Sequence, residues 1–419
     1  MNTLRFMTSG SVDNGKSTLI GRLLYDSNSI LMDQLSVVKK RSLKNNNEDH
    51  KIDLSLFTDG LRAEIEQGIT IDVAYKYFST SKRKFIIADV PGHTQYTRNM
   101  VTGATHVDLS IILIDACYGV VEQTQRHSLI LGMLNIPNII LAINKMDLVN
   151  YDQQIYQSII SKYEIIAKRV GLNNKIETIP ISAKNGDNVV NKSKHMKWYT
   201  GPSLLYLLEN IIINKEPYLE PSRYPVQYVI ISKNEKKKNI NRGYAGKIIS
   251  GTYKKGDKVR IYPSKSKTYI QSIMDNGVHT IKEAVAPKSV VLYLEDEIDI
   301  SRGDLIVKEK DIHPIFSQKL EVILCWMSNN SLNKRNRYLF QIHSLVVPVL
   351  IEKIIYRIDV NTLKMENDPL YAELNDLVRV KMKTSIPIPY DSYKKIKENG
   401  ASILIDETNY STVAACMIQ

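Results

Sequence analysis

The sequence predicts an α/β domain with a doubly wound, mostly parallel sheet, followed by two small antiparallel β-barrels. A glycine-rich loop near the start lies between an apolar strand and an amphipathic helix, and strands then alternate with helices to about residue 215. The second half instead consists of short β-rich runs separated by glycines. Because 419 residues are too many for one core, we predict three domains, over residues 1–215, 222–312 and 315–419.

Composition and cysteine usage indicate a soluble, cytoplasmic protein. The contents of 43% hydrophobic and 24% charged residues are ordinary for a globular chain. Cys117, Cys325 and Cys416 are far apart and odd in number, so they predict neither a disulfide framework nor a zinc site, which fits a reducing compartment. No apolar run is long enough to span a bilayer, and we expect no membrane partner.

The formal net charge of +12 leaves two interpretations open. A basic balance can indicate a nucleic-acid partner or another acidic partner. Lysines recur along the whole chain, however, and aromatic residues are not interleaved with them in one patch. We therefore favour a charge spread over the surface, with nucleic acid as the less favoured partner.

The glycine-rich loop is the first candidate site. It follows a predicted strand over 4–8 and precedes a predicted helix over 18–25. Glycines allow the backbone to curl, so that successive N–H groups and the helix N-terminus face a phosphate. The lysine would reach the β- and γ-phosphates, and the serine hydroxyl would bind Mg²⁺. The loop reads G-x-x-x-x-G-K-S and comprises Gly10, Ser11, Val12, Asp13, Asn14, Gly15, Lys16 and Ser17.

A long polar connection over 25–70 separates the first helix from the next motif. A connection of this length inside a compact α/β domain is usually functional or mobile. Thr70, at its end, is a candidate second hydroxyl ligand for Mg²⁺, in a loop ordered only while the γ-phosphate is present.

The second motif follows a predicted buried strand over 84–88 and comprises Asp89, Val90, Pro91, Gly92 and His93. Asp89 suits an outer-shell role at Mg²⁺, and the N–H of Gly92 could sense the γ-phosphate. His93 could orient the attacking water. The alternative, a surface histidine that stabilises a turn, fits its spacing to the other motifs less well. The candidate catalytic residues are thus His93, Thr70 and Lys16.

The third and fourth motifs predict a guanine pocket. Strands over 107–115 and 139–143 and helices over 121–135 and 152–171 lead to them. An N-K-x-D loop offers a carboxylate that accepts hydrogen bonds from the guanine N1–H and exocyclic amine, which excludes adenine. The asparagine braces this loop and the lysine stem covers the base face, while the backbone of the fourth motif closes over the guanine oxygen. The residues are Asn144, Lys145, Met146 and Asp147, then Ser182, Ala183 and Lys184.

Four motifs in this order predict a GTPase domain, with GTP and Mg²⁺ bound beyond the carboxyl ends of the strands. After it, β-rich runs over 224–310 and 315–419 predict the two barrels. The basic tract at 233–238 lies between two predicted strands, and we expect it to form a solvated hairpin tip.

The layout of one GTPase domain and two barrels resembles the translational GTPase superfamily. Within it, the chain resembles the family of sulfate adenylyltransferase subunit 1, the GTPase subunit of bacterial ATP sulfurylase. The matching strings cover nearly the whole chain, and those in the barrels separate this family from elongation factors. They lie at 10–17, 20–24, 67–75, 95–100, 295–304 and 356–361.

The resemblance implies a division of labour. GTP hydrolysis on this chain would drive the formation of adenosine 5′-phosphosulfate and pyrophosphate from ATP and sulfate in sulfate assimilation. A separate, smaller catalytic subunit would carry out the adenylyl transfer, in a heterodimer or its multimer. His93 would lie beside the attacking water, with Val12 and Ile69 as an apolar gate. The open alternatives are an elongation factor-like carrier of aminoacyl-tRNA, which the basic charge suits, and a GTPase that has lost turnover.

The chain departs from the family pattern at three positions. Ile65 stands where the family usually has Arg, Val90 where it has Thr, and Thr94 where Glu is common. We expect Ile65 to loosen the first switch segment and Val90 to leave Mg²⁺ binding unaffected.

Overall fold

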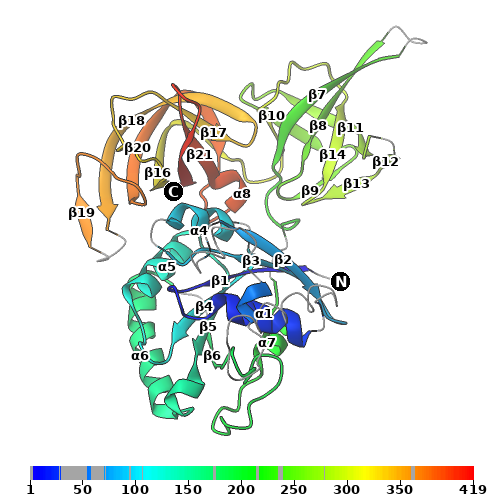
Figure 1. Cartoon of the computed structure of the whole chain (residues 1–419). Coiled ribbons are helices and arrows are strands. Elements are labelled where there is room, and N and C mark those ends of the chain that lie inside the picture. Colours follow the sequence, from blue (N-terminus) through cyan, green and yellow to red (C-terminus); the bar gives the residue numbers. More distant parts are fainter. Residues whose placement is uncertain are drawn as a thin grey trace. The chain divides into compact units, whose positions relative to one another are not determined.

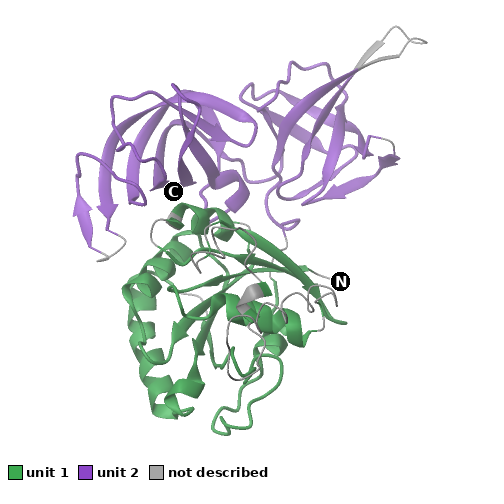
Figure 2. Cartoon of the chain, viewed as in Figure 1, with its two compact units in different colours: residues 1–213, 360–363 green, residues 214–359, 364–419 purple. Residues whose placement is uncertain are grey.

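A computed structural model describes the chain over residues 3–27, 29, 54–57, 70, 72–93, 96–105, 107–172, 176–213, 217–234, 239–277, 279–359 and 364–419. The chain divides into two compact units. The first comprises residues 1–213 and 360–363, and the second comprises residues 214–359 and 364–419 (Figure 2).

The first unit is built on a six-stranded sheet of order β2-β3-β1-β4-β5-β6. Only β2 is antiparallel to its neighbour, β3, and the other pairings are parallel. The strands are β1 (Thr3–Ser9), β2 (Ala74–Ser79), β3 (Lys84–Asp89), β4 (Leu109–Asp115), β5 (Asn138–Asn144) and β6 (Ile176–Pro180). The prediction of a doubly wound, mostly parallel sheet is confirmed.

Helices lie on both faces of this sheet, with α1 and α7 on one face and α5 and α6 on the other (Figure 1). Every residue of β4 is buried, as expected for a central strand covered on both sides. Leu19 and Leu23 of α1 share a core cluster with Leu204 and Leu208 of α7. The helices are α1 (Lys16–Asp26), α4 (Thr97–Ala104), α5 (Glu122–Met133), α6 (Gln153–Arg169) and α7 (Leu204–Asn210), with short 3-10 turns η1 (Leu54–Phe57) and η3 (Met146–Val149).

Most of the connection predicted over 25–70 lies outside the described residues. Its described part includes η1, which packs closely on α1: a Cβ added at Gly21 would overlap the backbone oxygen of Leu54. This approach requires a glycine on α1 at that position.

The second unit begins with a closed antiparallel barrel. Its seven-stranded sheet has the order β10-β15-β7-β8-β14-β11-β12, and a further pairing of β10 with β11 closes it. A separate pair, β9 with β13, accompanies it. The strands are β7 (Tyr224–Asn234), β8 (Asn239–Lys247), β9 (Thr252–Lys254), β10 (Lys258–Tyr262), β11 (Lys267–Asp275), β12 (His279–Ile281), β13 (Glu283–Val285), β14 (Ser289–Leu294) and β15 (Leu305–Lys308). The predicted hairpin tip lies largely outside the described residues.

A second closed barrel follows, of order β17-β21-β22-β16-β20-β18-β19, closed by a pairing of β17 with β18. Buried and exposed residues alternate along much of β18 and β20, because one face of each strand lines the barrel core. The elements are β16 (Ile315–Trp326), β17 (Tyr338–Ile342), β18 (Leu345–Ile358), β19 (Met365–Asn367), β20 (Leu377–Tyr390), α8 (Lys397–Gly400), β21 (Ala401–Asp406) and β22 (Thr412–Ile418). The prediction of two small antiparallel barrels is confirmed.

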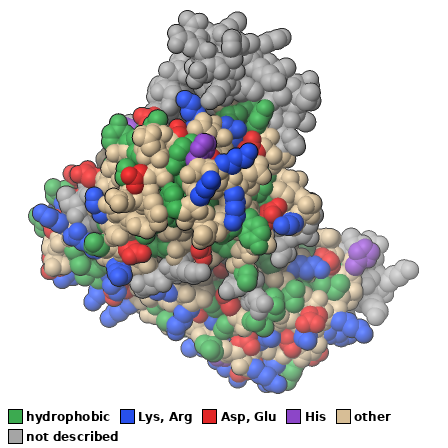
Figure 3. Space-filling view, turned by 90° about the horizontal axis from the view of Figure 1, so that it is seen from below, with side chains coloured by type: hydrophobic (Ala, Val, Ile, Leu, Met, Phe, Trp, Pro, Cys, Tyr) green, Lys and Arg blue, Asp and Glu red, His purple; other side chains and the backbone are tan. Residues whose placement is uncertain are grey.

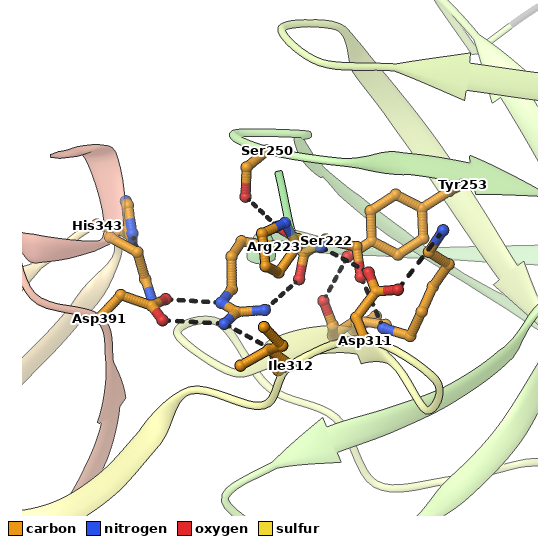
Figure 4. A network of polar contacts seen from close by, with 12 residues as sticks. Ser222, Arg223, Ser250, Tyr253, Asp311, Ile312, His343 and Asp391 are labelled. Atoms are coloured by element: carbon orange, nitrogen blue, oxygen red, sulfur yellow. Dashed lines mark hydrogen bonds and ion pairs between the residues drawn. The ribbon is translucent and has the colours of Figure 1, made fainter. Parts of the chain in front are cut away.

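A buried ion pair joins the two barrels (Figure 4). Arg223, just before β7, is fully buried, and its Nε and one terminal nitrogen donate to the two carboxylate oxygens of Asp391 at 2.7 and 2.9 Å. Asn399 donates to the same carboxylate at 2.7 Å and contacts the His343 ring at 3.0 Å. Bidentate arginine–carboxylate geometry fixes the relative orientation of the groups that carry it, so this network holds the barrels together within the second unit.

Candidate functional site

The loop between β1 and α1 has a backbone that only glycine adopts easily at two positions. Gly10 has a φ of 140° and Gly15 a φ of 86°. A Cβ added at Gly10 would lie 2.5 Å from the backbone oxygen of Leu113, at the end of β4. A Cβ added at Gly15 would lie 2.5 Å from Nδ2 of Asn144, at the end of β5. The loop is therefore packed against the carboxyl ends of two neighbouring strands.

Lys16, the first residue of α1, is buried and directs its ammonium group back into the loop. Its Nζ donates to the backbone oxygens of Gly10, at 3.1 Å, and Ser11, at 2.8 Å. Burial lowers the pKa of Lys16 to about 8, and the charges of Asp89 and Asp13 oppose that shift. Ser17, the next residue, is half-buried in the first turn of α1.

The second predicted motif lies beside this lysine. Asp89 ends β3, is buried, and is the register partner of Thr8 on β1. A Cβ added at Gly92 would lie 2.8 Å from the backbone oxygen of Gly10 and would also overlap the Nζ of Lys16, so this close approach of the two loops favours glycine. The structure thus brings Asp89, Val90, Pro91 and Gly92 to the same sheet edge as the first loop.

The structure describes His93 and Thr70, but part of the surroundings of each lies outside the described residues. The ring of His93 is half-buried and lies 6.1 Å from the ring of Tyr96, centroid to centroid. Thr70 is half-buried between segments that lie outside the described residues, so its role as an Mg²⁺ ligand stays a prediction. Ile65, Ile69 and Thr94 also lie outside the described residues.

Helix α5 contributes two polar contacts that the sequence patterns did not predict. The Gly10 N–H donates to Nδ1 of His127 at 3.0 Å, and both groups are buried. One helical turn earlier, the Gln123 amide donates to the backbone oxygen of Gly92. Residues four apart share a helix face, so one turn of α5 contacts both the glycine-rich loop of residues 10–17, called the phosphate loop below, and the turn of residues 89–93. The only feature of the sequence that relates to these contacts is the spacing of Gln123 and His127, four residues apart on a predicted helix.

His127 should make the protein sensitive to acid. Burial, then the charges of Lys16 and Arg126, lowers its pKa from 6.5 to about 3. Between these values the unfolded chain binds a proton that the folded chain does not, so the free energy of unfolding falls as pH decreases below 6.5, by up to about 1.4 kcal/mol per pH unit. We expect His127→Asn, which keeps an acceptor but does not titrate, to show a shallower decline.

Urea unfolding of the wild type and of His127→Asn between pH 7 and pH 4 checks this expectation. The contribution of His127 is fully present above pH 6.5 and is lost toward pH 3. Equal pH slopes for the two proteins would contradict it.

Asn144, the last residue of β5, connects three of the predicted motifs. It is buried, and its Nδ2 donates to the backbone oxygen of Asn14 at 2.8 Å. Its Oδ1 accepts from the backbone N–H of Ala183 at 2.9 Å. A single amide side chain thus holds the phosphate loop and the 182–184 loop at fixed positions around its own strand end.

The rest of the predicted base pocket lies around Asn144. Lys145 has a left-handed backbone, with a φ of 61°, and its Nζ pairs with Asp115 at 2.7 Å. Met146 is buried, and its N–H donates to the Ile181 oxygen at 3.2 Å. Asp147 is half-buried in η3 and carries the only carboxylate of the predicted base loop.

The 182–184 loop has its own internal support. Ser182 is fully buried, and its Oγ accepts from the Asn185 N–H at 3.2 Å. Its backbone N–H donates to the Asp187 oxygen at 3.1 Å. The loop is therefore a defined turn next to the base pocket.

Basic side chains do not gather in one patch on the face shown in Figure 3, where Lys and Arg are interspersed with Asp, Glu and hydrophobic residues. On this face, the positive charge is therefore spread out and not concentrated in one patch. No helix within the described ranges has the length and apolar character needed to cross a membrane.

Comparison with family models gives two matches. Residues 1–217 match the elongation factor Tu GTP binding domain, which is more than half of the chain. Residues 319–419 match the family described as GTP-eEF1A C-terminal domain-like.

Curated relatives match almost the entire chain. Sulfate adenylyltransferase subunit 1 of Pseudoalteromonas atlantica is 47% identical over 417 residues, covering 99% of this chain and 87% of the relative. The subunit 1 of Aliarcobacter butzleri is 47% identical over 418 residues, with the same coverages. The bifunctional enzyme CysN/CysC of Rhodopirellula baltica is 46% identical over 418 residues, covering 99% of this chain and 63% of the relative.

A solved structure supports the fold alone. The GTPase-like domain of Ski7 from S. cerevisiae, bound to GTP, aligns with 100% of this chain and 97% of its own, at a TM-score of 0.53 and 17% identity.

Proposed function

This chain belongs to the sulfate adenylyltransferase subunit 1 family, and on that premise we propose that it is the GTP-hydrolysing subunit of a sulfate adenylyltransferase. GTP hydrolysis here drives the formation of adenosine 5′-phosphosulfate and pyrophosphate from ATP and sulfate. A smaller catalytic subunit, implied by the relatives' designation as subunit 1, transfers the adenylyl group in the cytoplasm. The family membership favours this function over delivery of aminoacyl-tRNA.

The observation that carries the proposal is the convergence of the four loops at one sheet edge. Lys16 contacts the first loop and lies against Gly92 of the second, and Asn144 joins the first loop to the fourth. A ligand at this edge would meet backbone donors and a buried ammonium at one end and the Asp147 carboxylate at the other. That polarity fits a guanosine triphosphate, with its phosphates on the loop and its base against Asp147.

The donor set also fits Mg²⁺. This ion prefers a few oxygen ligands and keeps several of its waters. The Ser17 hydroxyl lies in the first turn of α1, and the Asp89 carboxylate lies on the last residue of strand β3. We propose that Ser17 and Thr70 hold the ion and that Asp89 acts through its water shell. When bound, the ion would neutralise charge on the β- and γ-phosphates.

The protein's own groups would then position the reaction. Lys16 binds the phosphate oxygens, and the Gly92 N–H donates a hydrogen bond to the γ-phosphate when that group is present. His93 follows this turn directly, so a shift of the turn moves its ring, and we propose that it orients the attacking water. Phosphoryl transfer depends mainly on positioning and electrostatic stabilisation, which these fixed donors supply.

A coupled assay tests the proposal. The purified chain is combined with the small catalytic subunit, ATP and sulfate, and GTP hydrolysis and adenosine 5′-phosphosulfate are both measured. We expect the GTPase rate to rise when all components are present and product formation to require hydrolysable GTP. A rate indifferent to the partner and to sulfate would contradict the proposed coupling, and slow turnover under every condition would favour a GTPase that has lost turnover.

His93→Ala should slow GTP hydrolysis by about 10²- to 10⁴-fold, the range for a positioned acid–base group, while changing GTP affinity less than about threefold. Single-turnover hydrolysis and equilibrium binding separate the two effects. His195→Ala is a matched control, because His195 stacks on Tyr151 at 4.8 Å and has no proposed role in the reaction. Equal losses of rate and affinity in His93→Ala would make His93 a structural residue.

A further inference from the structure

Arg22 connects α1 to the 182–184 loop. It lies on α1, whose N-terminus faces the predicted phosphate site. Its Nε donates to the backbone oxygen of Ala183 at 3.1 Å, and a terminal nitrogen donates to the backbone oxygen of Lys184. One side chain therefore contacts two consecutive carbonyl groups in a loop 161 positions away along the chain.

The contact fixes the direction in which the loop presents its N–H groups. In a planar trans peptide the N–H points opposite to the C=O of the same unit. Because Arg22 holds the Ala183 oxygen, the Lys184 N–H points away from α1. The neighbouring donors already have acceptors: the Ala183 N–H contacts Asn144 Oδ1 at 2.9 Å, and the Asn185 N–H contacts Ser182 Oγ at 3.2 Å. In the part of the chain that the structure describes, the Lys184 N–H has no protein acceptor.

The surroundings hold Arg22 in this arrangement. Asp26, one turn later on α1, lies 3.4 Å from its other terminal nitrogen. Gly186, with a φ of 85°, ends the loop next to the arginine: a Cβ added there would lie 3.6 Å from Cδ of Arg22. A guanidinium offers a rigid, planar set of donors that can bridge two carbonyls and a carboxylate, which a single ammonium cannot.

We infer that Arg22 is a positioning residue for base selectivity, holding the Lys184 N–H so that it donates to the O6 of guanine. The inference rests on the proposed function, because it assumes a guanine nucleotide at this edge. Guanine and hypoxanthine both carry an oxygen at position 6, whereas adenine carries an amine, which cannot accept this bond. Arg22 therefore acts on recognition of O6, while Asp147 acts on N1 and the exocyclic amine.

Dissociation constants of GTP, ITP and ATP, measured with Mg²⁺ for the wild type, Arg22→Ala and Arg22→Lys, test the inference. We expect Arg22→Ala to raise the dissociation constants of GTP and ITP about tenfold each, the effect of one lost hydrogen bond. The dissociation constant of ATP should stay unchanged. The GTP-to-ATP preference then falls about tenfold, and the GTP-to-ITP ratio stays constant. Arg22→Lys keeps the positive charge but loses the planar set of guanidinium donors. Its dissociation constants for GTP and ITP should lie between those of the wild type and of Arg22→Ala.

Arg169→Ala is the control. It removes the same charge from an exposed position at the end of α6, and all three constants should stay unchanged. Circular dichroism checks folding, and Arg22→Lys carries the comparison if Arg22→Ala does not fold. Equal weakening of all three nucleotides, or no change, would overturn the inference, since it would leave Arg22 with a general support role or none. A wild type that does not prefer GTP to ATP would contradict the proposed function instead.

Discussion

Lys16→Ala is expected to abolish tight GTP binding, raising the dissociation constant by about two to three orders of magnitude. The Nζ of Lys16 is buried between the phosphate loop and Gly92, 3.1 and 2.8 Å from the oxygens of Gly10 and Ser11. A triphosphate at this edge would take charge-assisted hydrogen bonds from it, each worth about 1.5–3 kcal/mol. No other ammonium of the predicted motifs is held against this loop in the described structure.

Titration of the variant with GTP and Mg²⁺ by calorimetry measures the loss. Lys162→Ala, at an exposed position of α6, is the matched control and should bind as the wild type does. A dissociation constant for Lys16→Ala within about threefold of the wild-type value would show that Lys16 does not bind the phosphates.

Asp147→Asn should move nucleotide preference from GTP toward xanthosine triphosphate, changing the ratio of the two affinities by about three orders of magnitude or more. In the proposed site, the Asp147 carboxylate would accept hydrogen bonds from the guanine N1–H and exocyclic amine. An asparagine amide instead donates to the oxygen that xanthine carries in place of that amine. Asp147 is half-buried in η3, beside the buried Met146, so the exchange of partners occurs close to the core.

Competition between GTP and xanthosine triphosphate for binding to the variant measures this change. The coupled assay then tests which of the two nucleotides supports product formation. With the variant, xanthosine triphosphate should replace GTP as the nucleotide that supports adenosine 5′-phosphosulfate formation. Retained strict preference for GTP would show that Asp147 does not read the base.

The fold of the first unit was predictable because its signals are local. A central strand such as β4 is buried on both faces, so it appears as a continuous apolar run, and the second and third predicted motifs directly follow runs of this kind, over 85–88 and 139–143. The alternation of strands and helices implies right-handed crossover connections, which place the helices on the faces of the sheet. The amino-acid sequence alone therefore suffices to place the residues at the strand ends along one edge of the sheet.

The sequence predicts that the second half forms two β-barrels, but it does not predict all of their strands or the contact between them. Short strands such as β9, β12 and β13 have three residues each and leave no clear periodicity. The Arg223–Asp391 pair joins positions 168 apart and connects two barrels that belong to one compact unit, which no local pattern indicates. The division at 1–215, 222–312 and 315–419 stays a prediction.

Contacts that support the site from a distance escaped the sequence patterns. His127 lies 117 positions from Gly10, and Arg22 lies 161 positions from Ala183. Each is a polar residue on a helix, where a solvent-facing role is the ordinary expectation. Only the packing of α1 and α5 against the loops shows that these side chains face inward.

Equilibrium binding of GTP and ATP to the purified chain, with Mg²⁺ present, tests the central claim most directly. The convergence of a phosphate loop, a buried lysine and the Asp147 loop at one edge predicts that GTP binds at least about a thousandfold more tightly than ATP. Comparable affinities for the two nucleotides would contradict the assignment of this edge as a guanine nucleotide site.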